Sequence, residues 1–231
     1  MVAGLLATAP PAGQADGTLG GLVAVTTDYV FRGVSQTRGG PATQAGLQYR
    51  VDAGWFVGAW GSTVDLNPGE GATVELNLFG GRAWQINSGW EARLTAVHYA
   101  YPNDTERLRY DYDELMVSVA WRDAIIANVA WSPNTSRYSS YGKATRETAV
   151  TIDLVGRWSL HPHWVVFGGL GHYDLDALFG TSYQYGSFGI AGSFAPLDAQ
   201  LAYHFTSDRA KHLFGQEVAG DRWSLTATWR F

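Results

Sequence analysis

The chain has 231 residues, of which 16% are charged and 14% aromatic, and its formal net charge is −5. A soluble globule usually has about a quarter charged residues, so this low fraction argues against an ordinary soluble protein. The negative balance argues against nucleic acid as a partner, and the absence of cysteine excludes disulfides and thiolate metal sites.

The first fifteen residues are rich in Ala, Gly and Leu and end in small residues. This composition is typical of the apolar core and cleavage region of a secretory signal. We predict that residues 1–15 are the remnant of a signal peptide whose basic start is missing, with cleavage after Ala15. The alternative is an unstructured Ala/Pro/Gly leader. Residues 16–20 are then a lead-in, and residues 21–231 form a single domain.

From residue 21 onward the chain divides into about twelve amphipathic segments, each near the roughly 9–11 residues of a tilted membrane strand. The predicted strands are 21–36, 41–52, 54–65, 72–84, 89–101, 110–122, 124–133, 146–160, 163–174, 182–195, 197–207 and 221–231. Short links follow every second strand, and most other links are longer and more polar. Outer-membrane barrels have short periplasmic turns and longer outer loops, and an even strand count places both termini in the periplasm.

The last strand alternates without an error, with Trp223, Leu225, Ala227, Trp229 and Phe231 on one face. Such a strand needs a partner on both sides, because an unpaired backbone edge in hydrocarbon costs several kcal/mol per group. We therefore predict an all-β fold, an antiparallel transmembrane β-barrel integral to the bacterial outer membrane. Its expected partners are outer-membrane lipid and the barrel-assembly machinery, which would recognise the strand ending at Phe231.

Aromatic residues gather at both ends of the predicted strands. Beside the short turns or the C-terminus are Trp55, Trp84, Trp90, Trp121, Trp158, Trp164, Trp229 and Phe231. Near the long loops are Tyr99, Tyr101, Tyr110, Tyr112, Tyr173, Tyr183, Tyr203 and Phe205. Because amphipathic rings prefer the headgroup level, we predict two membrane-interface belts.

The alternation also assigns faces. Val25, Tyr29 and Phe31 are expected to face lipid, with Asp28 and Arg32 inside. The third, ninth and tenth strands are ambiguous. A charge facing the middle of the bilayer costs about 2–4 kcal/mol for Lys or Arg, so charges are expected in the lumen. The predicted lumen charge cluster is Asp28, Arg32, Asp65, Glu75, Glu91, Arg93, Glu114, Asp153 and Arg157.

One stretch resembles a known family. Asp28 and Tyr29, then Phe31, Arg32 and Gly33, then Ser35 and Gln36, and later Trp60, Gly61, Ser62 and Asp65 are similar to the signature of the TorF-type putative porins. Thr63 stands where that family is expected to have asparagine. The resemblance implies an outer-membrane barrel with a transport role and no established substrate.

Within this signature we expect Arg32 to bridge Asp28, Asp65 and Glu75 across the lumen, because guanidinium matches carboxylate pairs. The alternative is that the cluster only braces the wall.

The sequence contains only weak signals for a catalytic or metal-binding site. His204, Ser207 and Asp208 are the nearest candidate for a rim hydrolase, and the pair His161 and His163 is a poor metal site. We predict no enzyme activity, no cofactor and no metal. The predicted function is a porin-like channel for small polar solutes or ions, with a narrow lumen and a mild preference for cations. The alternatives are an outer-membrane hydrolase and a non-conducting structural barrel.

Overall fold

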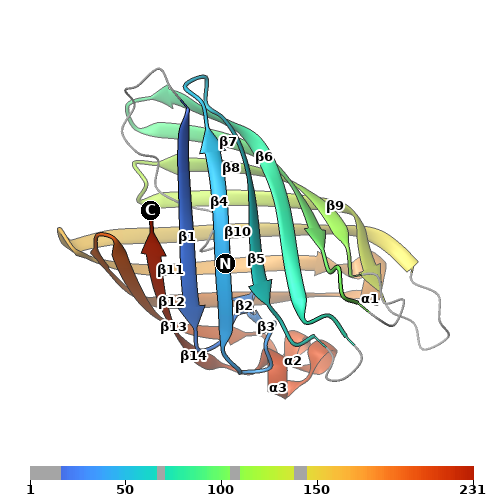
Figure 1. The fold of residues 1–231 in the computed structure, drawn as a ribbon. Coiled ribbons are helices and arrows are strands. Elements are labelled where there is room, and N and C mark those ends of the chain that lie inside the picture. Colours follow the sequence, from blue (N-terminus) through green and yellow to red (C-terminus); the bar gives the residue numbers. More distant parts are fainter. Residues whose placement is uncertain (1–16, 67–70, 105–109, 138–144) are drawn as a thin grey trace.

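Twelve strands close into one antiparallel barrel in the computed structural model, which describes residues 17–66, 71–104, 110–137 and 145–231 (Figure 1). The wall strands are β1 (Thr18–Thr26), β4 (Ala42–Arg50), β5 (Trp55–Thr63), β6 (Val74–Asn87), β7 (Trp90–Ala100), β8 (Tyr112–Trp121), β9 (Ile125–Arg137), β10 (Thr145–His161), β11 (Trp164–Leu175), β12 (Thr181–Phe194), β13 (Leu197–Thr206) and β14 (Arg222–Arg230). The predicted fold class is confirmed. The predicted signal remnant lies outside the described residues, and β1 begins within the predicted lead-in.

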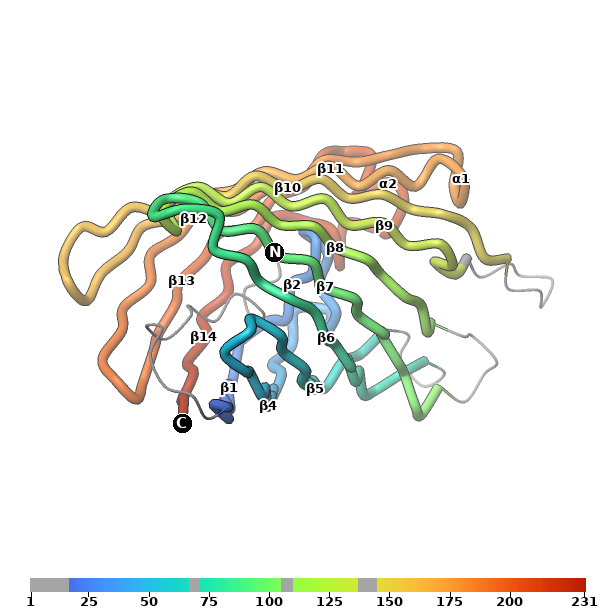
Figure 2. The backbone as a smooth tube through the Cα atoms, turned by 90° about the horizontal axis from the view of Figure 1, so that it is seen from above, coloured from blue at the N-terminus to red at the C-terminus, as the bar shows by residue number. Residues whose placement is uncertain are grey.

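The barrel closes where the last strand meets the first. β14 pairs with β13 on one side and with β1 on the other, from Leu22↔Arg230 to Thr26↔Thr226. The backbone N–H and C=O of Phe231 both bond to Gly21, at 3.0 and 2.7 Å. Figure 2 shows this closure, with the red C-terminal strand beside the blue N-terminal one. The last strand thus has a partner on each side, as its pattern predicts.

The two ends of the barrel differ. Short links join β4–β5, β6–β7, β8–β9, β10–β11 and β12–β13 at the end that also holds Phe231, which we call the short-turn end. The opposite, long-loop end carries the helices α1 (Asp176–Phe179), α2 (Asp208–Phe214) and α3 (Gln216–Ala219). Among the described residues, no helix is long and apolar enough to cross a membrane.

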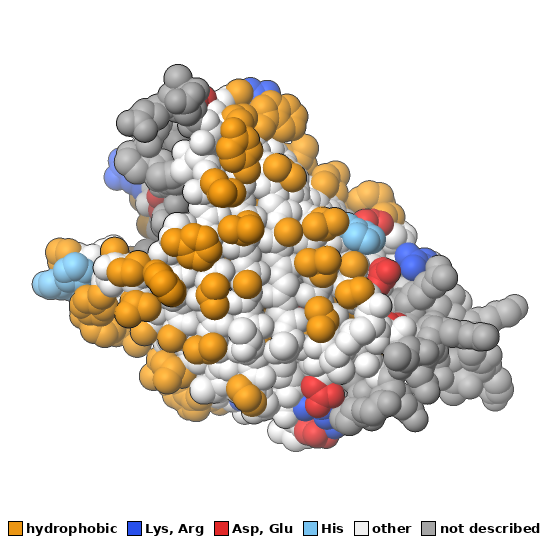
Figure 3. All heavy atoms as spheres, in the orientation of Figure 1, with side chains coloured by type: hydrophobic (Ala, Val, Ile, Leu, Met, Phe, Trp, Pro, Cys, Tyr) orange, Lys and Arg blue, Asp and Glu red, His pale blue; other side chains and the backbone are white. Residues whose placement is uncertain are grey.

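The outside of the wall is apolar. Val25, Val57 and Leu154 are each more than half exposed there. On the face drawn in Figure 3, hydrophobic side chains cover the strands while charged ones lie toward the ends. The tryptophans predicted beside the short turns, together with Phe231, are all exposed, from 37% for Trp121 to 66% for Phe231. In the ambiguous third strand, Phe56 is buried and Trp55 exposed, so Phe56 faces the lumen.

The first predicted strand, 21–36, is wrong in its second half. β1 ends at Thr26, and residues 27–41, which we call the inner segment, leave the wall before β4 begins at Ala42. The inner segment contains its own small hairpin, β2 (Val30–Phe31) and β3 (Val34–Ser35). Tyr29 and Phe31 therefore pack against buried residues inside the barrel instead of facing lipid.

Candidate functional site

The tip of the β2–β3 hairpin is a two-residue turn. Arg32 and Gly33 both have positive φ, +49° and +80°, the combination that a tight turn between twisted strands requires. A Cβ on Gly33 would lie 2.6 Å from Thr206 and 2.7 Å from Tyr185, so the tip packs directly against β12 and β13. Glycine is thus needed here both for its conformation and for its size.

Arg32 is the centre of the packing around this tip. Its side chain forms an ion pair with Glu114 of β8 at 2.7 Å, and both groups are almost completely buried. The guanidinium also lies over the rings of Phe31 and Tyr173, 4.7 and 4.6 Å from their centroids, where the ring faces attract a cation. The Tyr183 hydroxyl donates a hydrogen bond to the Arg32 carbonyl, at 3.1 Å. The hairpin tip is therefore fixed to several strands of the wall, from β8 to β12.

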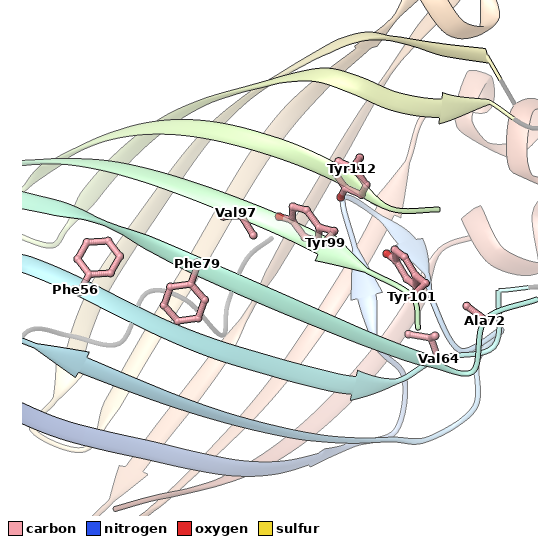
Figure 4. Packing of buried hydrophobic residues seen from close by; sticks show 8 residues of the cluster. All are labelled: Phe56, Val64, Ala72, Phe79, Val97, Tyr99, Tyr101 and Tyr112. Carbon is pink, nitrogen blue, oxygen red and sulfur yellow. The ribbon is translucent and has the colours of Figure 1, made fainter. Parts of the chain in front are cut away.

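Six tyrosines surround the tip and close the lumen at this level. They come from β7, the β7–β8 link, β8, β11 and β12, each is at most 9% exposed, and we call them the tyrosine layer: Tyr99, Tyr101, Tyr112, Tyr173, Tyr183 and Tyr185. Tyr99 stacks on Tyr112 at 4.3 Å and donates to Glu114 at 3.1 Å. Figure 4 shows Tyr99, Tyr101 and Tyr112 beside the hairpin, with Phe56 and Phe79 farther along the lumen.

The predicted long-loop belt is therefore partly wrong. Of its members, Tyr99, Tyr101, Tyr112, Tyr173 and Tyr183 point into the barrel, where they pack on the inner segment. Tyr203 lies on the outward face, in contact with Phe188 and Trp223.

A second ion pair fixes the start of the inner segment. Asp28 accepts a hydrogen bond from Arg222 of β14 at 2.9 Å. Its other oxygen accepts from Ser35 at 2.5 Å and from Thr37 at 3.0 Å. Asp28 is 5% exposed, so this set of donors satisfies an otherwise costly buried carboxylate. The sequence analysis missed Arg222, although the clean alternation of the last strand places it on the polar face.

The expected bridge from Arg32 to Asp28, Asp65 and Glu75 is wrong, because Arg32 lies at the hairpin tip and pairs with Glu114. Glu75 instead accepts from Asn77 at 2.7 Å and from Tyr29 at 3.3 Å. Asp65 follows β5, and its backbone N–H donates to the Gln36 carbonyl of the inner segment.

The remaining predicted lumen charges lie in separate places along the barrel. Glu91 pairs with Arg93 of the same strand at 3.1 Å, near the short-turn end. Asp153 accepts from Tyr185 at 2.5 Å. Arg157 lies four residues further along β10 and lines the cavity described next. The charged residues predicted to form one lumen cluster therefore form several separate groups along the barrel.

On the short-turn side of the tyrosine layer the lumen is hollow. A cavity of about 890 Å³ reaches from Pro162, Pro196 and Phe231 at the short-turn end to Tyr29 and Phe31 of the inner segment. Tyr99 forms part of its blind end. Among the described residues, this cavity therefore ends at the tyrosine layer and the inner segment.

The structure does not bring together the residues considered for a hydrolase site or for a metal site. His204 Nε2 lies 2.9 Å from Ser224 Oγ, whereas Ser207 Oγ accepts from the backbone N–H of Gln184, so these contacts do not assemble the candidate set of His204, Ser207 and Asp208. The rings of His161 and His163 lie 6.0 Å apart, and the described residues contain no group of three metal-ligating side chains.

A charged pair at the long-loop end joins α2 to the residue that precedes β14. The ammonium of Lys211 in α2 lies 2.9 Å from Asp221. This hydrogen bond lowers the pKa of Asp221 and raises the pKa of Lys211.

Comparison with known proteins places the chain in a family. A family model described as "Bacterial protein of unknown function (Gcw_chp)" matches residues 11–229. The chain belongs to the Gcw_chp family. No curated protein matches this Gcw_chp protein.

Solved structures resemble its fold at low identity. The NanC porin aligns with a TM-score of 0.58 and 10% identity, covering 91% of this Gcw_chp chain and 98% of its own. The KdgM porin gives 0.58 and 6%, covering 92% and 99%. An outer membrane channel from Pseudomonas putida F1 gives 0.54 and 12%, covering 97% and 100%. At these identities the likeness concerns the barrel fold.

Proposed function

We propose that this Gcw_chp protein is an outer-membrane channel for small polar solutes or ions, narrow and closed at rest. The observation that carries the proposal is a closed barrel, apolar outside, that encloses a cavity of about 890 Å³. The shared fold with two porins and an outer membrane channel supports it, as does the resemblance of the inner segment to the TorF-type signature. A barrel of eight strands is filled by side chains, so twelve strands leave room for a path.

In this proposal the short-turn end faces the periplasm, as in other outer-membrane barrels. The exposed tryptophans near that end then lie at the inner membrane interface, where their amphipathic rings are stable. The barrel-assembly machinery would recognise β14 and Phe231, and outer-membrane lipid would cover the apolar wall.

Passage through the barrel requires the inner segment to move. The tyrosine layer and the Arg32–Glu114 pair are almost completely buried, and together with the inner segment they fill the lumen at this level. The segment is not part of the wall, and β1 remains paired with β4 from Thr18↔Arg50 to Thr26↔Ala42. The hairpin can therefore shift without opening the barrel. We propose that its displacement is the opening step.

Single-channel conductance in a planar bilayer tests the proposal. Arg32→Ala removes the ion pair and the stacking on Phe31 and Tyr173, and leaves Glu114 buried without its partner. We expect the wild type to open rarely and Arg32→Ala to open about tenfold more often, since weakening the closed state by roughly 1.4 kcal/mol suffices for that change. Arg38→Ala is the matched control, because it removes a charge of the same segment whose pair with Glu217 is partly exposed.

Two results would contradict the proposal. Folded, inserted protein that stays insulating in all three forms would exclude a channel. A wild type that is permanently open, with Arg32→Ala unchanged, would exclude closure by the inner segment. Because the lumen charges are largely paired with opposite charges, ion selectivity is expected to be weak, and the cation preference follows only from the net charge of −5.

A further inference from the structure

We infer that the cavity on the short-turn side of the tyrosine layer is a binding site for an uncharged sugar of about one or two rings. This inference deepens the proposed channel by naming the class of solute that it handles. Its volume of about 890 Å³ falls within the roughly 300–1,000 Å³ typical of small-molecule sites. Its blind end provides a place where a solute can stop.

The cavity lining has two chemically different sides. Neutral hydrogen-bonding groups come from β4, β13 and β14, among them Gln44, Gln200, Thr226 and Thr228. Apolar side chains such as Ile126 and Val155 come from β9 and β10. Amides and hydroxyls both donate and accept hydrogen bonds, as sugar hydroxyls do. A sugar ring, with an apolar face and a polar rim, matches both sides.

Charge on the lining is largely neutralised. Asp28 is paired with Arg222, and Asp198 is paired with Arg230. Among the described lining residues, Arg157 is the only Asp, Glu, Lys or Arg without an ion pair. A ligand with several charges of one sign would find no matching set of opposite charges here. An uncharged ligand needs none.

The blind end has the features of a sugar subsite. Trp60 of β5 and Asn77 of β6 are register partners on the lumen face, and both reach the cavity. Tyr29 packs edge-on against Trp60 at 5.5 Å, which holds the indole in place. An aromatic ring so fixed offers a flat apolar surface to a sugar face.

Asn77 supplies the second, independent observation. Its amide nitrogen donates to Glu75 at 2.7 Å, which fixes the orientation of the amide. Its Oδ1 is buried and has no hydrogen-bond partner in the described structure, and the residue is only 3% exposed. A buried acceptor without a donor is unfavourable, so a ligand hydroxyl donating to Oδ1 would stabilise the complex.

Calorimetric titration of the folded barrel tests the inference. The detergent must be free of sugar, for example a polyoxyethylene ether, because a glycoside headgroup would compete. Maltose is the neutral probe, citrate the anionic probe and spermidine the cationic probe, because each of the last two carries several charges of one sign. We expect maltose to bind more tightly than either charged probe. Binding in micelles involves no transport, so a protein that conducts ions but does not bind maltose overturns this inference alone.

The variants separate the subsite from general effects. We expect Trp60→Ala to weaken maltose binding about tenfold and Trp60→Phe to retain most of it, since a ring remains. Gln200→Leu, on β13, is expected to weaken maltose binding about fivefold and keeps the test valid if Trp60→Ala does not fold. Trp84→Ala is the matched control, because Trp84 is exposed on the outside of β6. Equal affinity of Trp60→Ala and wild type, or tighter binding of a charged probe, would overturn the inference.

Discussion

The same twelve strands surround both halves of the lumen, but one half is filled with packed side chains and the other contains a cavity. Toward the long loops, β8 contributes Glu114 and β12 contributes Tyr183, both buried beneath the inner segment. Toward the short turns, β13 contributes Gln200 and β14 contributes Thr228, both lining an open cavity. The wall alone does not fill the lumen, because it leaves a cavity wherever the inner segment is absent. In the proposed channel, closure depends on the inner segment, the fifteen residues that leave the wall between β1 and β4.

Removing the hairpin is expected to have the largest effect on this difference. If residues 30–35 are replaced by two glycines, Arg32 and Phe31 are lost and the tyrosine layer loses its central support. The strands β1 and β4 keep their full register, so the barrel should fold. We expect the conductance in planar bilayers to rise severalfold, to the order of magnitude of an open pore of this diameter. Unchanged conductance would show that another part of the molecule closes the lumen.

Glu114→Gln is expected to have the next largest effect, because it leaves the buried Arg32 guanidinium without a counter-charge. Breaking a buried ion pair typically costs about 3–5 kcal/mol. We expect the inner segment to detach before the barrel unfolds, so trypsin should cleave after Arg32 much faster than in the wild type, as followed by mass spectrometry. Asp113→Asn is the control, since Asp113 lies on the outward face of the same strand and is exposed. Equal protection of Arg32 in Glu114→Gln and wild type would contradict a role for the pair.

Titration of the Asp221–Lys211 pair at the long-loop end should have the smallest effect on stability and conductance. The pKa of Asp221 is lowered by Lys211, so the stability from this pair is lost as the pH falls through the folded-state pKa of Asp221. The pKa of Lys211 is raised, so the contribution is also lost as the pH rises through that value. The pair is partly exposed and is not part of the tyrosine layer or the inner segment, so we expect the thermal unfolding temperature to change little between these two pKa values and the conductance to stay constant. A large change in conductance would place the controlling contact in α2.

The barrel wall could be predicted because one physical rule governs it. Every wall strand separates lipid from the lumen, so period-two alternation persists along each strand, and short turns alternate with long loops. β14 shows this well, since its alternation, its closure and its aromatic end are all visible in the sequence.

The inner segment could not be recognised by the same rule, because alternation continues from Val25 through Phe31 although the chain has left the wall. A period of two describes any extended segment, whether it lies in the wall or inside the barrel. The Arg32–Gly33 turn was the available signal, since an X-Gly pair between short apolar runs favours a hairpin.

The tyrosine layer could have been found from face parity. Glu91 and Arg93 were assigned to the lumen, and Tyr99 and Tyr101 follow them at even spacing on the same run, so they share that face. The preference of tyrosine for interfaces led to the opposite assignment. Which acid pairs with Arg32 could not be predicted, because that depends on how deeply the hairpin enters the barrel.

The ion pair between Asp28 and Arg222 joins residues 194 positions apart in the sequence. A nascent barrel whose last strand has not yet docked against the first lacks this contact, and the Thr27 hydroxyl likewise lacks the Leu225 N–H that it accepts from in the finished protein. The inner segment is therefore held in full only by a completed wall. In the proposed channel, the lumen is thus closed at the step that completes the barrel.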